Sequence, residues 1–138
     1  MNSARMRERG MQFTASEGAR LRGFRLVFDK ASKAHPDIGH ANLVYDRQSV
    51  VEGVLYRLLS DQEIVRMDPF ENAPINYSRE VVQVIGGVSC WTYFANPGVR
   101  RQGLAPSRSY LNHLLAGKTH LSDVYYQKLC QVQCLEDR

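Results

Sequence analysis

One carboxylate, Glu71, has the sequence setting that best suits proton chemistry. It follows Pro69 in the stretch from Met67 to Tyr77, between the expected end of a helix and the expected start of a strand. A carboxylate held on a loop above a sheet can take a proton from one group and deliver it to another. The chain has 14 acidic residues, and most such side chains are solvated surface groups, so a role for Glu71 needs support from its surroundings.

The other reactive side chains show no pattern of a metal site or a disulfide framework. The 3 cysteines are an odd number, and Cys130 and Cys134 have no second Cys or His cluster at zinc-ligand spacing. We therefore expect reduced thiols in a cytoplasmic protein, with no metal and no cofactor. No run approaches the ~20 apolar residues of a membrane span, and residues 1–10 lack the apolar centre of a signal peptide.

The net charge of +4 raises the question of a nucleic-acid partner. Arginines crowd the first fifth of the chain, but no aromatic-interleaved basic strand, glycine-rich RNA-binding signature or recognition helix accompanies them. A solvated basic face is therefore favoured, although the same charge can attract an anionic small substrate. We interpret four further basic side chains as solvated loop groups and leave them out of the candidate site: Lys30, His35, Arg100 and Arg101.

Hydrophobic periods and turn residues predict the N-terminal elements. Ser3 is expected to cap a short helix that Gly10 ends. Residues 19–28 alternate as one or two strands with a bend at Gly23, followed by a polar loop. Two strands are then expected over residues 40–45 and 50–59, joined by a hairpin at residues 46–49.

A helix and a strand are expected on either side of Glu71. Ser60 and Glu63 predict a capping box, and Pro69 is expected to force Asp68 out of helical geometry. Two strands joined by a tight turn at Gly86 and Gly87 follow. A helix is expected from Ser107 to Ala116, closed by Gly117, and Ser122 is expected to cap a last helix.

This order predicts a single α+β domain over residues 1–138. We expect a small mixed, mostly antiparallel curled sheet or β-barrel flanked by helices, because glycines interrupt the strands. A chain of this length can bury roughly two-thirds of its unfolded surface around one core.

Five segments in this order carry a resemblance to a known family: Gly39 to Val44, Val50 to Tyr56, Met67 to Glu71 with the Tyr77 strand, Ala105 to Tyr110, and Ser122 to Leu129. Together they resemble the γ-glutamylcyclotransferase superfamily, also called AIG2-like, over nearly the whole chain. The resemblance implies a compact barrel and the cyclisation of a γ-glutamyl amine or dipeptide to 5-oxoproline with release of the amine. By position, it implies that Glu71 is the general acid/base and that Tyr110 contacts the substrate.

The N-terminus departs from the family pattern. Members usually begin with a strand that ends in tyrosine, glycine, serine and asparagine, and the amides of this loop hold the glutamyl group. Met1 falls where the residue after that asparagine would be. Either the natural protein starts upstream of Met1 or this member lacks the loop, and we favour the first. Without the loop, we expect little activity and an unpaired sheet edge near Val51 to Leu58.

Three classes of function follow from these observations. An enzyme acting on a small γ-glutamyl substrate is favoured, as a monomer or homodimer without a nucleic-acid or membrane partner. A non-catalytic binding module on the same fold is the alternative, and Glu71 pointing into solvent would favour it. Nucleic-acid binding rests on charge alone.

Overall fold

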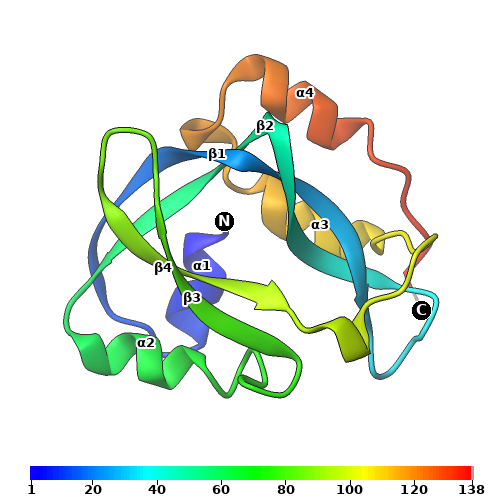
Figure 1. Cartoon of the computed structure of the whole chain (residues 1–138), viewed down its shortest axis with the longest axis horizontal. Coiled ribbons are helices and arrows are strands. Elements are labelled where there is room, and N and C mark those ends of the chain that lie inside the picture. Colours follow the sequence, from blue (N-terminus) through cyan, green and yellow to red (C-terminus); the bar gives the residue numbers. More distant parts are fainter. Residues whose placement is uncertain (138) are drawn as a thin grey trace.

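The computed structural model describes residues 1–137, which form an α+β fold (Figure 1). The elements are α1 (Ser3–Glu8), β1 (Phe13–Ala31), β2 (Gly39–Leu58), α2 (Asp61–Met67), β3 (Tyr77–Gln83), β4 (Ser89–Ala95), α3 (Arg108–Leu115) and α4 (Asp123–Cys130), with short 3-10 helices at Pro97–Val99 and Lys118–His120. β1 pairs with β2 and β3 pairs with β4, both antiparallel. The predicted class, α+β with mostly antiparallel strands, is confirmed.

The barrel alternative is wrong, because the sheets do not close within residues 1–137. Isolated contacts join the two sheets where a closed barrel would have a continuous ladder. The Ile85 N–H donates to the Arg20 carbonyl at 2.8 Å. The buried Asn42 side chain accepts from the Ala95 N–H at 2.8 Å and donates to Asp29 at 2.9 Å. The fold is therefore two curved antiparallel ribbons held together locally.

β1 and β2 are longer than predicted, and the hairpin expected at residues 46–49 is wrong. β2 continues through these residues, and the register changes between Arg22 and Phe24. Gly23 therefore lies alone opposite four residues of β2. Its φ of +88° allows the bend that was predicted there. The turn-rich tetrad makes an irregularity within a long ribbon, because pairing with β1 continues on both sides of it.

Two predicted features of the first helices are also wrong. α1 is capped by Asn2, whose side chain accepts from the Arg5 N–H at 3.2 Å, so Ser3 is already helical. The capping box does not form, because Glu63 is buried and its carboxylate accepts from the Gln12 N–H at 2.9 Å. A buried carboxylate needs such a donor more than a solvated helix end needs a cap.

α2 ends where predicted, but Asp68 does not leave helical geometry as expected. Its last residue is Met67, and Asp68 keeps helical angles, φ −50° and ψ −45°, despite the following proline. The predicted cap at Ser122 is confirmed, and Ser107, expected as the first residue of its helix, is the cap of that helix. Ser107 accepts from the Tyr110 N–H and Ser122 from the Tyr125 N–H, each at 3.2 Å.

α1 lies among three other elements (Figure 1). The Asn2 side chain forms a hydrogen bond of 3.1 Å with His113 on α3, and the Ser3 hydroxyl forms one of 3.3 Å with Tyr56 on β2. Met6 packs against a buried cluster beside α2, made of Met11, Ile64 and Met67. Within residues 1–137, β2 pairs only with β1, so the expected unpaired edge is present and side chains from the N-terminal segment lie against it.

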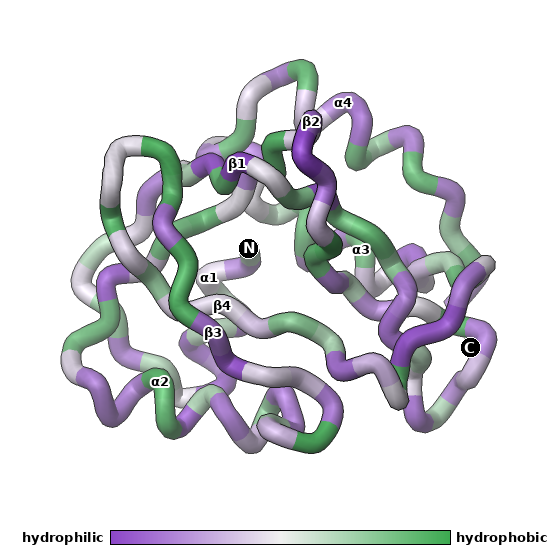
Figure 2. Tube along the Cα trace, viewed as in Figure 1, coloured by the Kyte–Doolittle hydropathy of each residue, from purple (hydrophilic) through white to green (hydrophobic). Residues whose placement is uncertain are grey.

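The turn of the β3–β4 hairpin lies beside β1, where the Ile85 N–H meets the Arg20 carbonyl. Gly86 and Gly87, at φ +104° and +94°, make that turn as predicted. Figure 2 shows hydrophobic residues near this tip, and the exposed ones are Val81, Ile85, Val88 and Trp91. The other end of the hairpin, where β3 begins at Tyr77, faces the candidate site. None of the helices in residues 1–137 is long and apolar enough to cross a membrane.

Candidate active site

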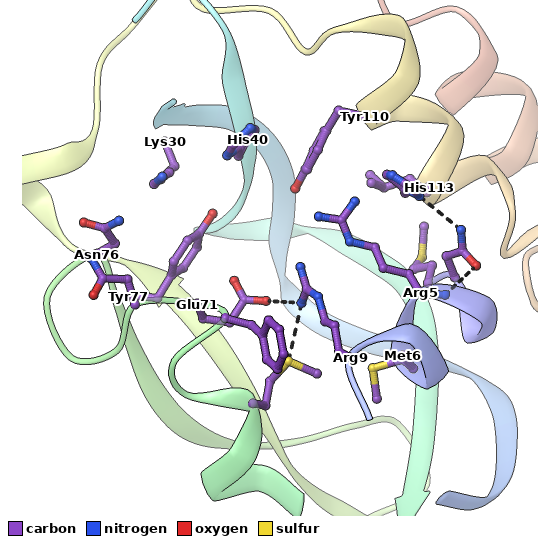
Figure 3. Close-up of a pocket in the computed structure, with 16 residues that line it drawn as sticks. Arg5, Met6, Arg9, Lys30, His40, Glu71, Asn76, Tyr77, Tyr110 and His113 are labelled. Carbon is purple, nitrogen blue, oxygen red and sulfur yellow. Dashed lines mark hydrogen bonds and ion pairs between the residues drawn. The ribbon is translucent and has the colours of Figure 1, made fainter. Parts of the chain in front are cut away.

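Side chains from most elements of the fold meet at one cavity of about 370 Å³ (Figure 3). Both residues proposed from the sequence line it: Glu71 from the loop between α2 and β3, and Tyr110 from α3. The other labelled side chains of this lining are Arg5, Met6, Arg9, Lys30, His40, Asn76, Tyr77 and His113. The fold thus places a carboxylate, phenols, imidazoles and cations around one space.

A hydrogen-bonded turn fixes the position of Glu71. Its N–H donates to the Met67 carbonyl at 3.3 Å, and the Ala73 N–H donates to the Asp68 carbonyl at 3.0 Å. Asn72 takes φ +48°, in the left-handed region that asparagine accepts more readily than most residues. The turn begins directly at the end of α2, so the direction of the Glu71 side chain depends on where that helix stops.

Glu71 forms an ion pair with Arg9, the residue that caps the C-terminal end of α1. The Arg9 Nη1 lies 3.2 Å from the Glu71 Oε1, and the two side chains are 20% and 26% exposed. The Arg9 guanidinium also lies 5.1 Å from the centroid of the Phe70 ring. The guanidinium therefore holds one oxygen of the carboxylate in place. The interpretation of the N-terminal arginines as a solvated face is wrong for Arg5 and Arg9, which line the cavity.

Two tyrosine hydroxyls bind the backbone of Ala41, where the β1–β2 ladder is irregular. The Tyr110 Oη accepts from the Ala41 N–H at 3.1 Å, and the Tyr77 Oη donates to the Ala41 carbonyl at 2.9 Å. The hydroxyl hydrogen of Tyr77 is thus used within the protein. The hydroxyl hydrogen of Tyr110 has no acceptor among residues 1–137, so Tyr110 can donate a hydrogen bond to a bound molecule.

The histidines of the cavity are neutral imidazoles near pH 7. His40 stacks on Tyr110 with ring centroids 4.6 Å apart, and burial, aided by Lys30 and Arg5, lowers the pKa of His40 to about 4. Burial and nearby cations also lower the pKa of His113. Burial raises the pKa of both Tyr110 and Tyr77, so both phenols stay protonated.

Lys30 is the main residue that the sequence interpretation misplaced. β1 extends to Ala31 and carries Lys30 into the cavity wall, where the residue is only 7% exposed. His35, Arg100 and Arg101 do not line the cavity. No alternation of the sequence marks this position, because the register of β1 changes between Val27 and Lys30. Within residues 1–137, no group of three or more His, Cys, Asp or Glu side chains is arranged to hold a metal ion.

Comparison with known proteins identifies both the family and the fold. The sequence model of the family described as "Gamma-glutamyl cyclotransferase, AIG2-like" matches residues 2–112. None of the curated proteins matches the chain in sequence. Among solved structures, a "Gamma-glutamyl cyclotransferase" is similar with a TM-score of 0.81 and 20% identity, over 97% of this chain and 83% of that one.

Two further structures share the fold. A Homo sapiens protein described as uncharacterized has a TM-score of 0.79 and 20% identity, over 98% of this chain and 82% of that one. YkqA from Bacillus subtilis has a TM-score of 0.75 and 21% identity, over 97% of this chain and 52% of that one. The matched range of the family model contains Glu71 and Tyr110 and confirms the resemblance found from the sequence. The chain belongs to the γ-glutamyl cyclotransferase, AIG2-like family.

Proposed function

We propose that the protein converts a γ-glutamyl amine or dipeptide to 5-oxoproline and releases the amine, with Glu71 as general acid and base. The observation that carries this proposal is the convergence of Glu71, Tyr110 and Arg9 on one cavity in a member of this family. A volume of about 370 Å³ lies within the range of small-molecule sites.

The reaction needs no nucleophile from the protein. Glu71 takes a proton from the substrate's α-ammonium, and the freed amine attacks the γ-carbonyl carbon to form the ring C–N bond. The γ-amide C–N bond then breaks, and Glu71 returns protons to the leaving nitrogen. Two protons move in total from the attacking to the leaving nitrogen, so atoms and charge balance without water or a redox partner. The cavity's main contribution is to hold the substrate curled for closure of the ring.

The neighbouring side chains suit supporting roles in this scheme. Arg9 holds the Glu71 carboxylate in a fixed orientation, with the Arg9 Nη1 3.2 Å from the Glu71 Oε1. Tyr110 has a hydroxyl hydrogen available for the oxygen of the γ-carbonyl, where negative charge develops during attack. Glu71 lines the cavity instead of pointing into solvent, which supports the enzyme over the non-catalytic binding module.

The start of the chain and the free thiols bear on the site and on the location of the protein. Met1 and Asn2 line the cavity, so the first residues of the chain are part of the proposed site. The free thiols Cys90, Cys130 and Cys134 support a location in the reducing cytoplasm. We expect a small γ-glutamyl molecule as the partner, not a nucleic acid.

The test is formation of 5-oxoproline by the protein expressed from the first in-frame start codon. We expect turnover of γ-glutamyl-alanine or γ-glutamyl-ethylamine, and a loss of about 10²- to 10⁴-fold in the Glu71→Gln variant. Glu8→Gln is the matched control, because Glu8 is an exposed carboxylate of α1 that does not line the cavity. Normal turnover by Glu71→Gln, or no 5-oxoproline from either substrate with the wild type, would refute the proposal.

A further inference from the structure

Two cations of the cavity lack an anionic partner within residues 1–137. Arg9 is paired with Glu71, whereas the side chains of Arg5 and Lys30 form no hydrogen bond or ion pair. The lining thus holds three cationic side chains against one carboxylate, since both histidines are neutral near pH 7. Such a cavity favours a ligand with more negative than positive charge.

Lys30 is built into the wall of the cavity. The residue is 7% exposed, and its Nζ lies 5.9 Å from the centroid of the Tyr77 ring. Lysine is almost never buried this far without a partner, because loss of water disfavours the ammonium. Burial accordingly lowers the pKa of Lys30, although the charge of Glu71 opposes this effect. A bound anion beside Nζ would offset the unfavourable burial.

The two unpaired cations reach the cavity from different directions. Arg5 precedes Arg9 by one helical turn and so shares the face of α1 that meets Glu71. Lys30 comes from β1, and Figure 3 shows it across the cavity from Arg5, with Tyr77 and the hydroxyl of Tyr110 between them. A ligand that contacts both cations must carry its negative groups at separate ends.

The positions of the charged groups in the proposed substrates indicate which of them would meet Arg5 and which would meet Lys30. The α-ammonium and α-carboxylate of a glutamyl group share one carbon, so the cation for that carboxylate must lie beside the base that receives the ammonium. We assign this carboxylate to Arg5, which lies one helical turn before Arg9, the partner of Glu71. A γ-glutamyl amino acid has a second carboxylate on its leaving group, whereas a γ-glutamyl amine has none. A bound γ-glutamyl amine would therefore leave the Lys30 ammonium without an anionic partner.

We propose that Lys30 binds the carboxylate of the leaving amino acid, so that the cavity selects γ-glutamyl amino acids over γ-glutamyl amines. This inference rests on the proposed function and narrows its substrate class. Lys30 is a specificity-determining residue in this scheme, because it touches the leaving group and takes no part in the proton transfer. A charge-assisted hydrogen bond of this kind is worth about 10- to 100-fold in affinity.

Binding of two ligands that cannot react tests the role of Lys30 without requiring turnover. Glutaryl-alanine and glutaryl-ethylamide lack the attacking α-amine, and they differ only in the carboxylate of the leaving group. Calorimetric Kd values are measured for the wild type and for Lys30→Met, Lys30→Arg and Lys33→Met. Lys33→Met is the matched control, since it removes the same charge from an exposed loop residue outside the cavity. Thermal unfolding checks that each variant is folded.

We expect the wild type to bind glutaryl-alanine about 10- to 100-fold more tightly than glutaryl-ethylamide. Lys30→Met should abolish this preference with less than about 3-fold change for the ethylamide, Lys30→Arg should keep part of it, and Lys33→Met should keep all of it. A preference that survives in Lys30→Met, or equal loss of both ligands, overturns the inference. If the preference depends on Lys30 but the wild type makes no 5-oxoproline from γ-glutamyl-alanine, the proposed reaction fails while the carboxylate site stands.

Discussion

The Arg9 Nη1 lies 3.2 Å from the Glu71 Oε1, and this ion pair connects α1 to the loop that carries the proposed acid/base group. The pair is mostly shielded from solvent, with side chains 20% and 26% exposed. Its value for the protein therefore lies in holding one carboxylate oxygen in place while the second stays available to the substrate. The position of α1 and the chemistry of Glu71 are coupled through a single guanidinium.

Removal of the Arg9 guanidinium should slow the reaction through Glu71. We expect Arg9→Met to lower kcat by about 10- to 100-fold, because a charge-assisted contact that orients the base is lost. In a double-mutant cycle on 5-oxoproline formation, Arg9→Met should add little to the defect of Glu71→Gln. Arg7→Met is the control, since Arg7 also lies over an aromatic ring from α1 but outside the cavity. Fully additive effects would show that Arg9 acts independently of Glu71.

The two tyrosines that bind Ala41 should differ in their effects on catalysis. Tyr110→Phe removes a hydroxyl hydrogen that is free to reach the substrate, so kcat/KM should fall about 10- to 100-fold. Tyr77→Phe removes a hydroxyl whose hydrogen already serves the Ala41 carbonyl, so it should cost about 1 kcal/mol of stability with less than about 3-fold change in kcat/KM. Urea denaturation and steady-state kinetics on both variants separate the two effects. Equal losses of kcat/KM in the two variants would contradict the view that only the Tyr110 hydroxyl hydrogen is available to the substrate.

Short-range signals explain which parts of the fold could be predicted from the sequence. Ser107 and Ser122 cap the helices that follow them, and Gly86 and Gly87 make a tight turn, because each feature depends on only a few neighbouring residues. Residues 46–49 have equally good turn chemistry and no partner in β1, yet pairing with β1 on both sides of them keeps β2 continuous. Local preference was insufficient wherever a distant strand competed with it.

The candidate site was only partly predictable for a related reason. Glu71 and Tyr110 were proposed through the family resemblance, and both line the cavity. Lys30, Arg5 and Arg9 were assigned to solvated surfaces, because a charged side chain is usually exposed and its own segment shows no reason for burial. Only the tertiary fold brings the end of β1 and the face of α1 against the same space. The charge of the cavity therefore could not be derived from local patterns.

Gly39 is a position where the fold leaves no room for a side chain. A Cβ added there would overlap the Phe28 carbonyl oxygen and lie 2.8 Å from the Leu104 Cβ. We expect Gly39→Ala to lower the free energy of unfolding by about 2 to 4 kcal/mol, because backbone atoms must shift. Gly53→Ala in the same strand is the control. The nearest atom to its added Cβ is the Met1 Sδ at 4.0 Å, so its stability should change by less than about 1 kcal/mol in urea denaturation.

His40 should make the protein less stable at acid pH. Burial lowers its pKa to about 4 in the folded state, against about 6.5 for a solvated imidazole, so the unfolded chain binds the proton more tightly between these values. Stability from this group is therefore fully present above about pH 6.5 and is lost as the pH falls toward 4. Because the ring is partly solvated, we expect a loss of about 1 to 2 kcal/mol.

The His40→Phe variant isolates this contribution from the carboxylates that also titrate at acid pH. Phenylalanine keeps a ring against Tyr110, where the His40 centroid lies 4.6 Å away, but it cannot bind a proton. Nearby Lys30 and Arg5 are unchanged, so the charges that oppose protonation of His40 remain in both proteins. Urea denaturation from pH 7 to pH 4 should therefore give a shallower loss of stability for His40→Phe than for the wild type. Parallel pH profiles would show that His40 has the same proton affinity in the folded and unfolded chains. The prediction would then be wrong, because it requires burial and the two cations to weaken proton binding in the folded state.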